Sequence, residues 1–194
     1  MKPAEFNEII RSRQSIFPKD YTGEKVDDAI VRQMLENATW APSHKLTEPW
    51  RFIVFSGEGL KTLADFQSEC YKRATLASGN FDEKKYEGLK TKPLESSHII
   101  AVGMKRDAKK GLPEWEELGA VFCAIENIYL TATAYGVGCY LSTGGIVPFK
   151  EAKVFFDLGE EDQLLGFIHV GVPKKNLHHN RKRKPVEEKM IWIS

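Results

Sequence analysis

Residues 118–149 decide the fold and read Leu-Gly-Ala-Val-Phe-Cys-Ala-Ile-Glu-Asn-Ile-Tyr-Leu-Thr-Ala-Thr-Ala-Tyr-Gly-Val-Gly-Cys-Tyr-Leu-Ser-Thr-Gly-Gly-Ile-Val-Pro-Phe. Apart from cysteines and tyrosines, Glu126 is the only ionisable residue in this stretch. Its first half, up to residue 135, is typical of a helix, and residues 138–142 are expected to form a strand that enters a tight glycine loop. A helix that is apolar nearly all round must be enclosed by protein or by lipid, because water on any face would be costly.

Lipid is the first alternative for this helix, since about 20 apolar residues can cross a bilayer. Against it, Glu126 and Asn127 would lie in the middle of the membrane, where an acid costs ~2.5–3.5 kcal/mol even on a lenient insertion scale. No basic cluster flanks the segment at either end. We therefore expect no membrane span but a core helix shared with a partner subunit. Glu126 would then be a buried acid that needs a partner, across that interface.

Length and composition fit one globular domain that spans residues 1–194. The chain is 42% apolar and 28% charged with a formal net charge of +1, which is ordinary for a soluble protein. A dedicated nucleic-acid binder would need many more phosphate-neutralising cations, so no nucleic-acid partner is expected.

The cysteines and the N-terminus indicate the compartment. Cys70, Cys123 and Cys139 are odd in number and form no Cys-x-x-Cys pair, so neither a disulfide framework nor a zinc site is expected. The N-terminus carries acids and lacks an apolar segment, so it does not resemble a signal peptide. A cytoplasmic location is expected.

The hydrophobic pattern alternates helices with short strands, which favours an α+β or α/β sheet flanked by helices. Helices are expected at residues 3–12, 27–41, 60–75 and 149–156, beside the long central one, and strands at residues 50–55, 95–104, 138–142 and 163–172. Residues 78–92 are polar and charged, with at most a short helix. The apolar residues 191–193 are expected to form an extra strand or an arm packed on a partner.

Metal and nucleophilic catalysis find little support in the sequence. None of the five histidines belongs to a His-Glu-x-x-His motif, and Gly-x-Ser-x-Gly is absent. His98 and His169 fall in expected strands and are predicted to be packed imidazoles. Gly136-Val-Gly138 lies between a helix and a strand, the reverse of the order that a Rossmann turn requires.

Two basic clusters, at residues 11–15 and 181–184, contain arginines that can donate two parallel hydrogen bonds to one phosphate. They favour a phosphorylated ligand.

Four motifs in register cover nearly the whole chain and together resemble the flavin-dependent nitroreductase family, in particular its small NAD(P)H nitroreductases with an Ala-Pro-x-His-Lys loop. The motifs are Arg-Gln-Ser at residues 13–15, Ala-Pro-Ser-His-Lys-Leu-Thr-Glu-Pro-Trp-Arg-Phe at 41–52, Ala-Tyr-Gly-Val-Gly-Cys-Tyr-Leu-Ser-Thr-Gly-Gly at 134–145, and Leu-Gly-Phe-Ile-His-Val-Gly-Val-Pro at 165–173.

This resemblance implies an α+β fold with a central mixed β-sheet flanked by helices and a long buried central helix. It also implies an intertwined homodimer with FMN at the subunit interface. By motif match, the residues that hold the cofactor are Arg13, Gln14 and Ser15 at the ribityl chain and phosphate, Trp40 and His44 beside the Ala-Pro dipeptide, Leu141, Ser142 and Thr143 against the flavin, and Arg181 and Arg183 at the phosphate.

The resemblance further implies an oxidoreductase in which FMN carries the chemistry, so that no catalytic side chain and no metal are expected. Hydride would pass from NADH or NADPH to a nitro compound, a quinone or a similar small acceptor by a ping-pong mechanism. The chain departs from the family at Gln14, which replaces a basic residue, and at Leu141 and Ser142, which replace Trp-Arg. Two alternatives stay open: a flavin-binding sensor or store without turnover, and a flavin enzyme of the same fold that acts on carbon bonds.

Overall fold

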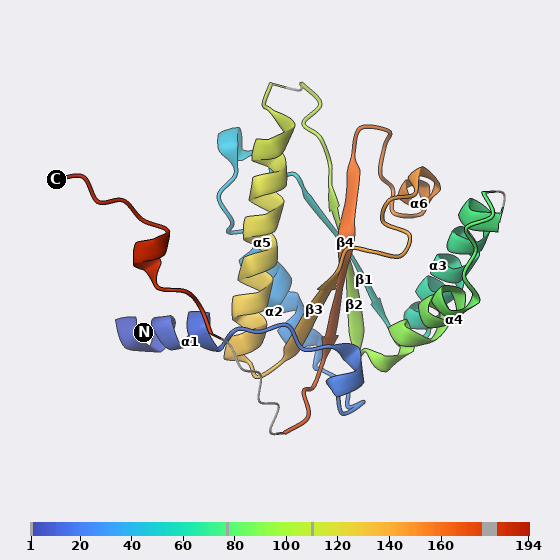
Figure 1. The fold of residues 1–194 in the computed structure, drawn as a ribbon, viewed down its shortest axis with the longest axis horizontal. Helices are drawn as coiled ribbons and strands as arrows, with labels where there is room; N and C mark the ends of the chain where they lie inside the picture. Colours follow the sequence, from blue (N-terminus) through green and yellow to red (C-terminus); the bar gives the residue numbers. More distant parts are fainter. Residues whose placement is uncertain (1, 77, 110, 176–181) are drawn as a thin grey trace.

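The computed structural model describes residues 2–76, 78–109, 111–175 and 182–194 and has an α+β fold around a four-stranded sheet (Figure 1). The strands are β1 (Trp50–Ser56), β2 (His98–Met104), β3 (Gly138–Ser142) and β4 (Gln163–Gly171), in the spatial order β1-β2-β4-β3. The helices are α1 (Pro3–Ser12), α2 (Asp28–Ala38), α3 (Glu58–Leu76), α4 (Glu83–Thr91), α5 (Glu114–Ala134) and α6 (Lys150–Phe155), with short 3₁₀ turns η1 (Pro18–Asp20), η2 (His44–Leu46), η3 (Lys92–Glu95) and η4 (Val186–Glu188).

All three strand pairs are antiparallel, which corrects the expected mixed sheet. Among the described residues, parallel pairing is confined to one isolated bridge between Ser15 and Cys139. The apolar pattern could not reveal strand direction, because a strand buried on both faces reads as a continuous apolar run whichever way its neighbours point. Strand β2 is such a case, with all seven residues buried.

Helices cover both faces of the sheet (Figure 1). Helices α2 and α5 pack on one face with residues such as Met34, Ile100 and Ile128, whereas α3 and α6 pack on the other with Leu63 and Ile99. Successive residues of a strand point to opposite faces, so Ile99 and Ile100 enter different cores. The two layers hold the sheet as a rigid platform, and β3 lies at its edge.

The central helix α5 is buried on one side only. Val121, Ile125 and Ile128 face the sheet and are buried, whereas Phe122 is 49% exposed on the opposite side. Within one chain, protein therefore covers helix α5 only on the side that faces the sheet. Within the single chain the Glu126 side chain is 54% exposed and lies 3.8 Å from Arg13, so its burial at a subunit interface stays a prediction.

The buried acid of α5 is instead Glu117, whose side chain is only 1% exposed. It forms an ion pair with Arg106 and accepts a 2.8 Å hydrogen bond from the backbone N–H of Asp107. Arg106 also donates to the carbonyl oxygen of Leu112, and its backbone N–H donates to Asp162. This network fastens the loop after β2 to the first turns of α5.

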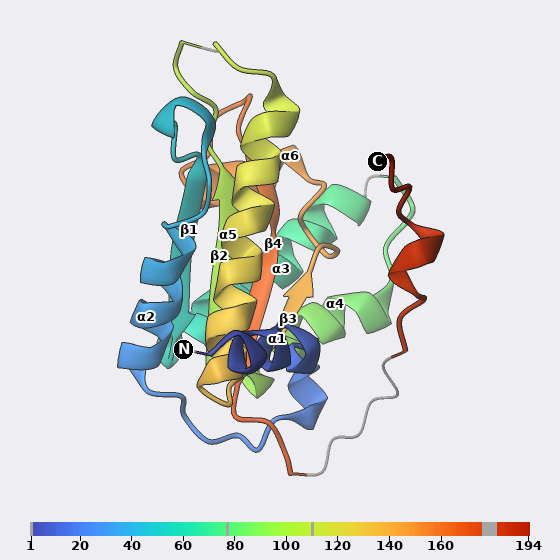
Figure 2. The ribbon, with the colours of Figure 1, turned by 90° about the vertical axis from the view of Figure 1, so that its left-hand side faces the viewer.

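The chain ends extend along the outside of the molecule. Helix α1 has no buried residue and lies across the C-terminal part of α5 (Figure 2). Residues 182–194 are all exposed and contain no strand, so of the two expectations for residues 191–193 the extra strand is not found and the arm on a partner stays a prediction. No helix in the described part of the chain combines the length and the apolar character that crossing a bilayer requires.

Candidate functional site

The segment that follows α1 is tied to the edge strand β3. Ser15 forms a parallel bridge with Cys139, and the backbone N–H of Ile16 donates to the carbonyl oxygen of Cys139 at 2.9 Å. Beneath this segment, the hydroxyl of Tyr21 shares its proton between the carbonyl oxygens of Ile16 (2.9 Å) and His169 (3.0 Å). Burial raises the pKa of the Tyr21 hydroxyl, so it remains a donor and fixes the segment on the sheet.

Arg13 and Gln14 are held close to α5. The Arg13 guanidinium lies over the Tyr129 ring, 5.5 Å from its centroid, in a cation–π contact. Gln14 is half-buried, and its Oε1 atom is fully buried with no hydrogen-bond partner among the described residues. A buried acceptor without a donor is costly. The site therefore presents a cation, an amide oxygen in need of a donor and the exposed Ser15 on one short segment.

Tyr129 connects this segment to the second predicted cofactor segment. Its hydroxyl accepts the backbone N–H of Leu141 at 2.6 Å. Burial is the main reason why the pKa of Tyr129 is raised, and the nearby Ser15 side chain acts to lower that pKa. Sequence reasoning missed this residue because a tyrosine in an apolar helix looks like core. The sequence could have indicated Tyr129, because a tyrosine buried in an apolar helix usually needs a polar partner for its hydroxyl.

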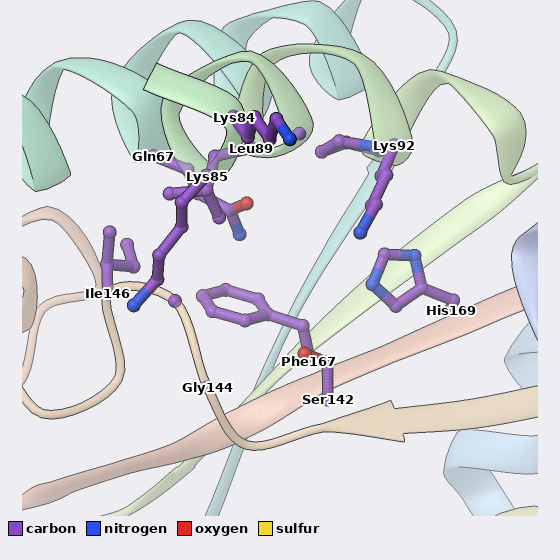
Figure 3. Close-up of a pocket in the computed structure, with 13 residues that line it drawn as sticks. Gln67, Lys84, Lys85, Leu89, Lys92, Ser142, Gly144, Ile146, Phe167 and His169 are labelled. Atoms are coloured by element: carbon purple, nitrogen blue, oxygen red, sulfur yellow. The ribbon is translucent and has the colours of Figure 1, made fainter. Parts of the chain in front are cut away.

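The second segment, residues 141–143, turns at the end of β3. The Leu141 side chain packs against the core on the α5 side of the sheet. Ser142 points to the opposite side and lines a cavity of about 220 Å³ between β4, α4 and the loop that contains Gly144 and Gly145 (Figure 3). Thr143 is exposed. The structure thus brings the two predicted segments together around β3 and leaves a cavity beside them.

His169 lies on the β4 side of this cavity and is neutral at neutral pH. It is 8% exposed, and burial, reinforced by the nearby Lys92 cation, lowers its pKa to about 4. Its Nδ1 atom lies 2.9 Å from the hydroxyl oxygen of Ser96. His98 is also buried, and its pKa is lowered by burial. Both histidines are packed imidazoles, which confirms the prediction for them.

The remaining predicted residues lie elsewhere. Trp40 is 82% exposed and borders an apolar groove beside α1 and α5. His44, in η2, contacts Glu116 near the N-terminal end of α5, whereas α1 lies at the other end of that helix (Figure 1). Arg183 is exposed on the C-terminal segment, and Arg181 lies outside the described residues. One chain alone therefore does not assemble the whole predicted set.

In the described part of the chain, no three side chains of His, Cys, Asp or Glu lie close enough together to bind a metal ion. The arrangement around β3 suits an organic ligand that bears an anionic group and hydroxyl donors.

Comparisons with known proteins show which proteins the chain resembles. The model of the nitroreductase family matches residues 10–172, which include both segments. The Bacillus subtilis protein YfhC, provisionally named an NAD(P)H nitroreductase, is 28% identical over 187 residues, covering 94% of this chain and 91% of that protein.

Solved structures share the fold. A nitroreductase-like family protein from Bacillus cereus superposes with a TM-score of 0.83 at 26% identity, over 100% of this chain and 98% of that chain. A nitroreductase from Desulfovibrio desulfuricans, solved in complex with FMN, superposes with a TM-score of 0.70 at 24% identity, over 100% of this chain and 98% of that chain. The likeness therefore extends over the whole sheet and its helices.

Proposed function

Because the chain belongs to the nitroreductase family, we propose that it is an FMN-containing oxidoreductase that takes hydride from NADH or NADPH and passes it to a nitro compound, a quinone or a similar acceptor. The observation that carries this proposal is that the two cofactor segments meet at β3, where Ser15 bridges Cys139 and the Tyr129 hydroxyl accepts the N–H of Leu141. The name of YfhC and the FMN of the Desulfovibrio structure support it. The reducing cytoplasm, which supplies NAD(P)H, is the proposed location.

The residues present fit FMN. Arg13 and Ser15 would hold the phosphate and the ribityl chain, and the buried Oε1 of Gln14 would accept a hydrogen bond from a ribityl hydroxyl. When bound, the flavin supplies the acceptance and donation of hydride. Among the described residues, the backbone N–H groups of Gly144 and Gly145 donate to no backbone carbonyl, so they can stabilise negative charge on the bound ring.

The second part of the proposal is a homodimer, because His44 lies near the N-terminal end of α5, whereas α1 and the segment that follows it lie at the other end. The exposed side of α5 forms the wall of an apolar groove, and a face of this kind marks an interaction site. The groove is lined by Phe6, Ile9, Asn37, Trp40, Asn127, Leu130, Thr131, Ala134 and Tyr135. A second copy on this face would cover the groove and bring its own Trp40 and His44 toward the flavin.

The direct test is a flavin titration of the purified protein, with its oligomeric state measured by light scattering. We expect one FMN per chain in a dimer, and loss of the visible flavin absorbance on adding NADH or NADPH with recovery on adding menadione. Arg13→Gln should weaken FMN binding roughly tenfold or more by loss of a charge-assisted contact, whereas Arg32→Gln, at an exposed arginine of α2, should not. A protein that retains no FMN refutes the proposal. A protein that binds FMN, with a flavin that neither NADH nor NADPH reduces, supports the alternative of a flavin-binding sensor or store without turnover.

The shared site has its own test. Arg13→Gln and Trp40→Ala homodimers should both bind FMN weakly. Mixed dimers made by unfolding and refolding the two variants together should regain one intact site, because Arg13 of one chain meets Trp40 of the other. No recovery, with mixed dimers shown to form, contradicts a site shared between subunits.

A further inference from the structure

The cavity beside the glycine loop has an unusual charge balance. Three lysines line it, Lys84 and Lys85 from α4 and Lys92 from η3, and no aspartate or glutamate does. In Figure 3 the side chains of Lys85 and Lys92 extend from the helical layer toward the loop and toward His169. His169 is neutral, so the positive charge of the cavity belongs to the lysines.

These lysines have no acidic partner among the described residues. Lys85 instead lies 4.9 Å from the centroid of the Tyr71 ring. Lys84 and Lys85 also fall in the first turn of α4, where the helix dipole disfavours cations. Because no acidic side chain neutralises these cations and the helix dipole disfavours them, they give the cavity a positive potential that attracts an anion.

The remaining walls suit a small flat ring. Phe167 from β4, Ile146 from the loop after β3 and Leu89 from α4 supply the apolar lining, and the Phe167 ring extends into the centre of the space (Figure 3). A volume of about 220 Å³ is below the range of drug-sized pockets, ~300–1,000 Å³. It accommodates one aromatic ring with its substituents and is too small for a dinucleotide.

We propose that this cavity binds the electron acceptor of the enzyme, and that the acceptor is a small monocyclic aromatic carboxylate whose anionic group lies against Lys85 and Lys92. The inference rests on the proposed function, because the adjoining loop at Gly144 is the one assigned to the flavin. For a nitro acid the balance is NAD(P)H + H⁺ + ArNO₂ → NAD(P)⁺ + ArNO + H₂O. The nicotinamide is oxidised by two electrons, the nitro group is reduced to nitroso, and one N–O bond breaks with its oxygen leaving as water.

The experiment compares para-nitrobenzoate with its neutral methyl ester on the FMN-loaded enzyme. The Lys85→Gln/Lys92→Gln variant should raise KM for the acid roughly tenfold, as expected from the loss of two solvent-accessible ion pairs, and leave KM for the ester unchanged. Lys90→Gln is the matched control, because Lys90 belongs to the same helix but does not line the cavity. Benzoate, which cannot be reduced, should bind the wild-type holoenzyme in a calorimetric titration and bind the double variant about tenfold more weakly.

Each other outcome overturns the inference in a recognisable way. If the double variant changes KM equally for the acid and the ester, the lysines do not recognise the carboxylate charge. A weaker apoprotein affinity for FMN in the double variant assigns the lysines to the flavin phosphate. A raised KM for NADPH but not for NADH assigns them to the nicotinamide donor. If the wild-type enzyme reduces the ester and menadione but shows no preference for the acid, the proposed function stands and this inference fails. If it reduces none of them, the proposed function fails.

Discussion

Two of the four glutamates of helix α5 lie in opposite environments within the chain, and replacing each by alanine separates a buried acid from an exposed one. Glu117 is 1% exposed and paired with Arg106, whereas Glu126 is 54% exposed and lies 3.8 Å from Arg13. Both substitutions remove the same charge from the same helix. Any difference between them therefore measures burial and hydrogen bonding.

The expected magnitudes follow from these contacts. Glu117→Ala leaves the Arg106 guanidinium, 14% exposed, without its carboxylate and the N–H of Asp107 without an acceptor. Removing one partner of a buried pair costs about 3–5 kcal/mol, which lowers the melting temperature of a chain of this size by roughly 6–20 °C. Glu126→Ala breaks an exposed pair and should cost about 0–1 kcal/mol.

The assay is urea unfolding of the two variants and the wild type at one protein and FMN concentration, because ligand and subunit concentrations shift the transition. We expect a lower midpoint for Glu117→Ala with an unchanged m-value. The double variant Arg106→Met/Glu117→Leu, which replaces the pair by apolar groups, should recover much of the loss. If Glu117→Ala costs no more than Glu126→Ala, water substitutes for the carboxylate and the reasoning is wrong.

Three further predictions concern the site and the sheet. Tyr129→Phe removes the acceptor of a backbone N–H of β3, so it should cost about 1–3 kcal/mol and weaken FMN binding in a titration; an unchanged FMN affinity would contradict its linking role. The pKa of His169 falls from 6.5 to about 4 on folding, so the unfolded chain binds the proton more readily. Stability is fully present above pH 6.5 and falls by about 3 kcal/mol as the pH drops toward 4, a slope that His169→Asn should reduce in unfolding measured across this range. In Gly171→Ala the added Cβ would lie 2.3 Å from the Tyr21 ring and should cost about 1–3 kcal/mol in thermal unfolding, whereas Gly119→Ala, which meets open space, should not destabilise.

The sequence predicted those elements whose ends are marked by glycine or proline and whose pattern is local. Residues 138–142 were predicted as a strand and form β3, because Gly138 and the following glycines bound a short apolar run. The resemblance in sequence also found the α+β fold, since four separated motifs constrain the whole chain. The extent of the domain as residues 1–194 stays a prediction.

Features that depend on distant contacts could not be predicted in this way. The one-sided exposure of α5 was missed because its apolar residues cover every side, and only the packed sheet shows which side is free. From sequence alone, helix α4 and its lysines were predicted only as a polar segment. The cavity that these lysines line is formed together with β4 and the loop after β3, which are distant in sequence. Tyr129 was passed over as core, and its hydroxyl, which accepts the N–H of Leu141, connects α5 to β3 in a way that no local pattern reveals.

The bridge between Ser15 and Cys139 also has a consequence for how the protein is made. Ser15 lies near the start of the chain, and its neighbours Tyr21 and Thr22 pair with Pro173 and Val172 near its end. A ribosome synthesises residues 15–22 long before the residues that hold them. A nascent chain therefore cannot complete this part of the sheet until residues 139 and 172–173 have been translated.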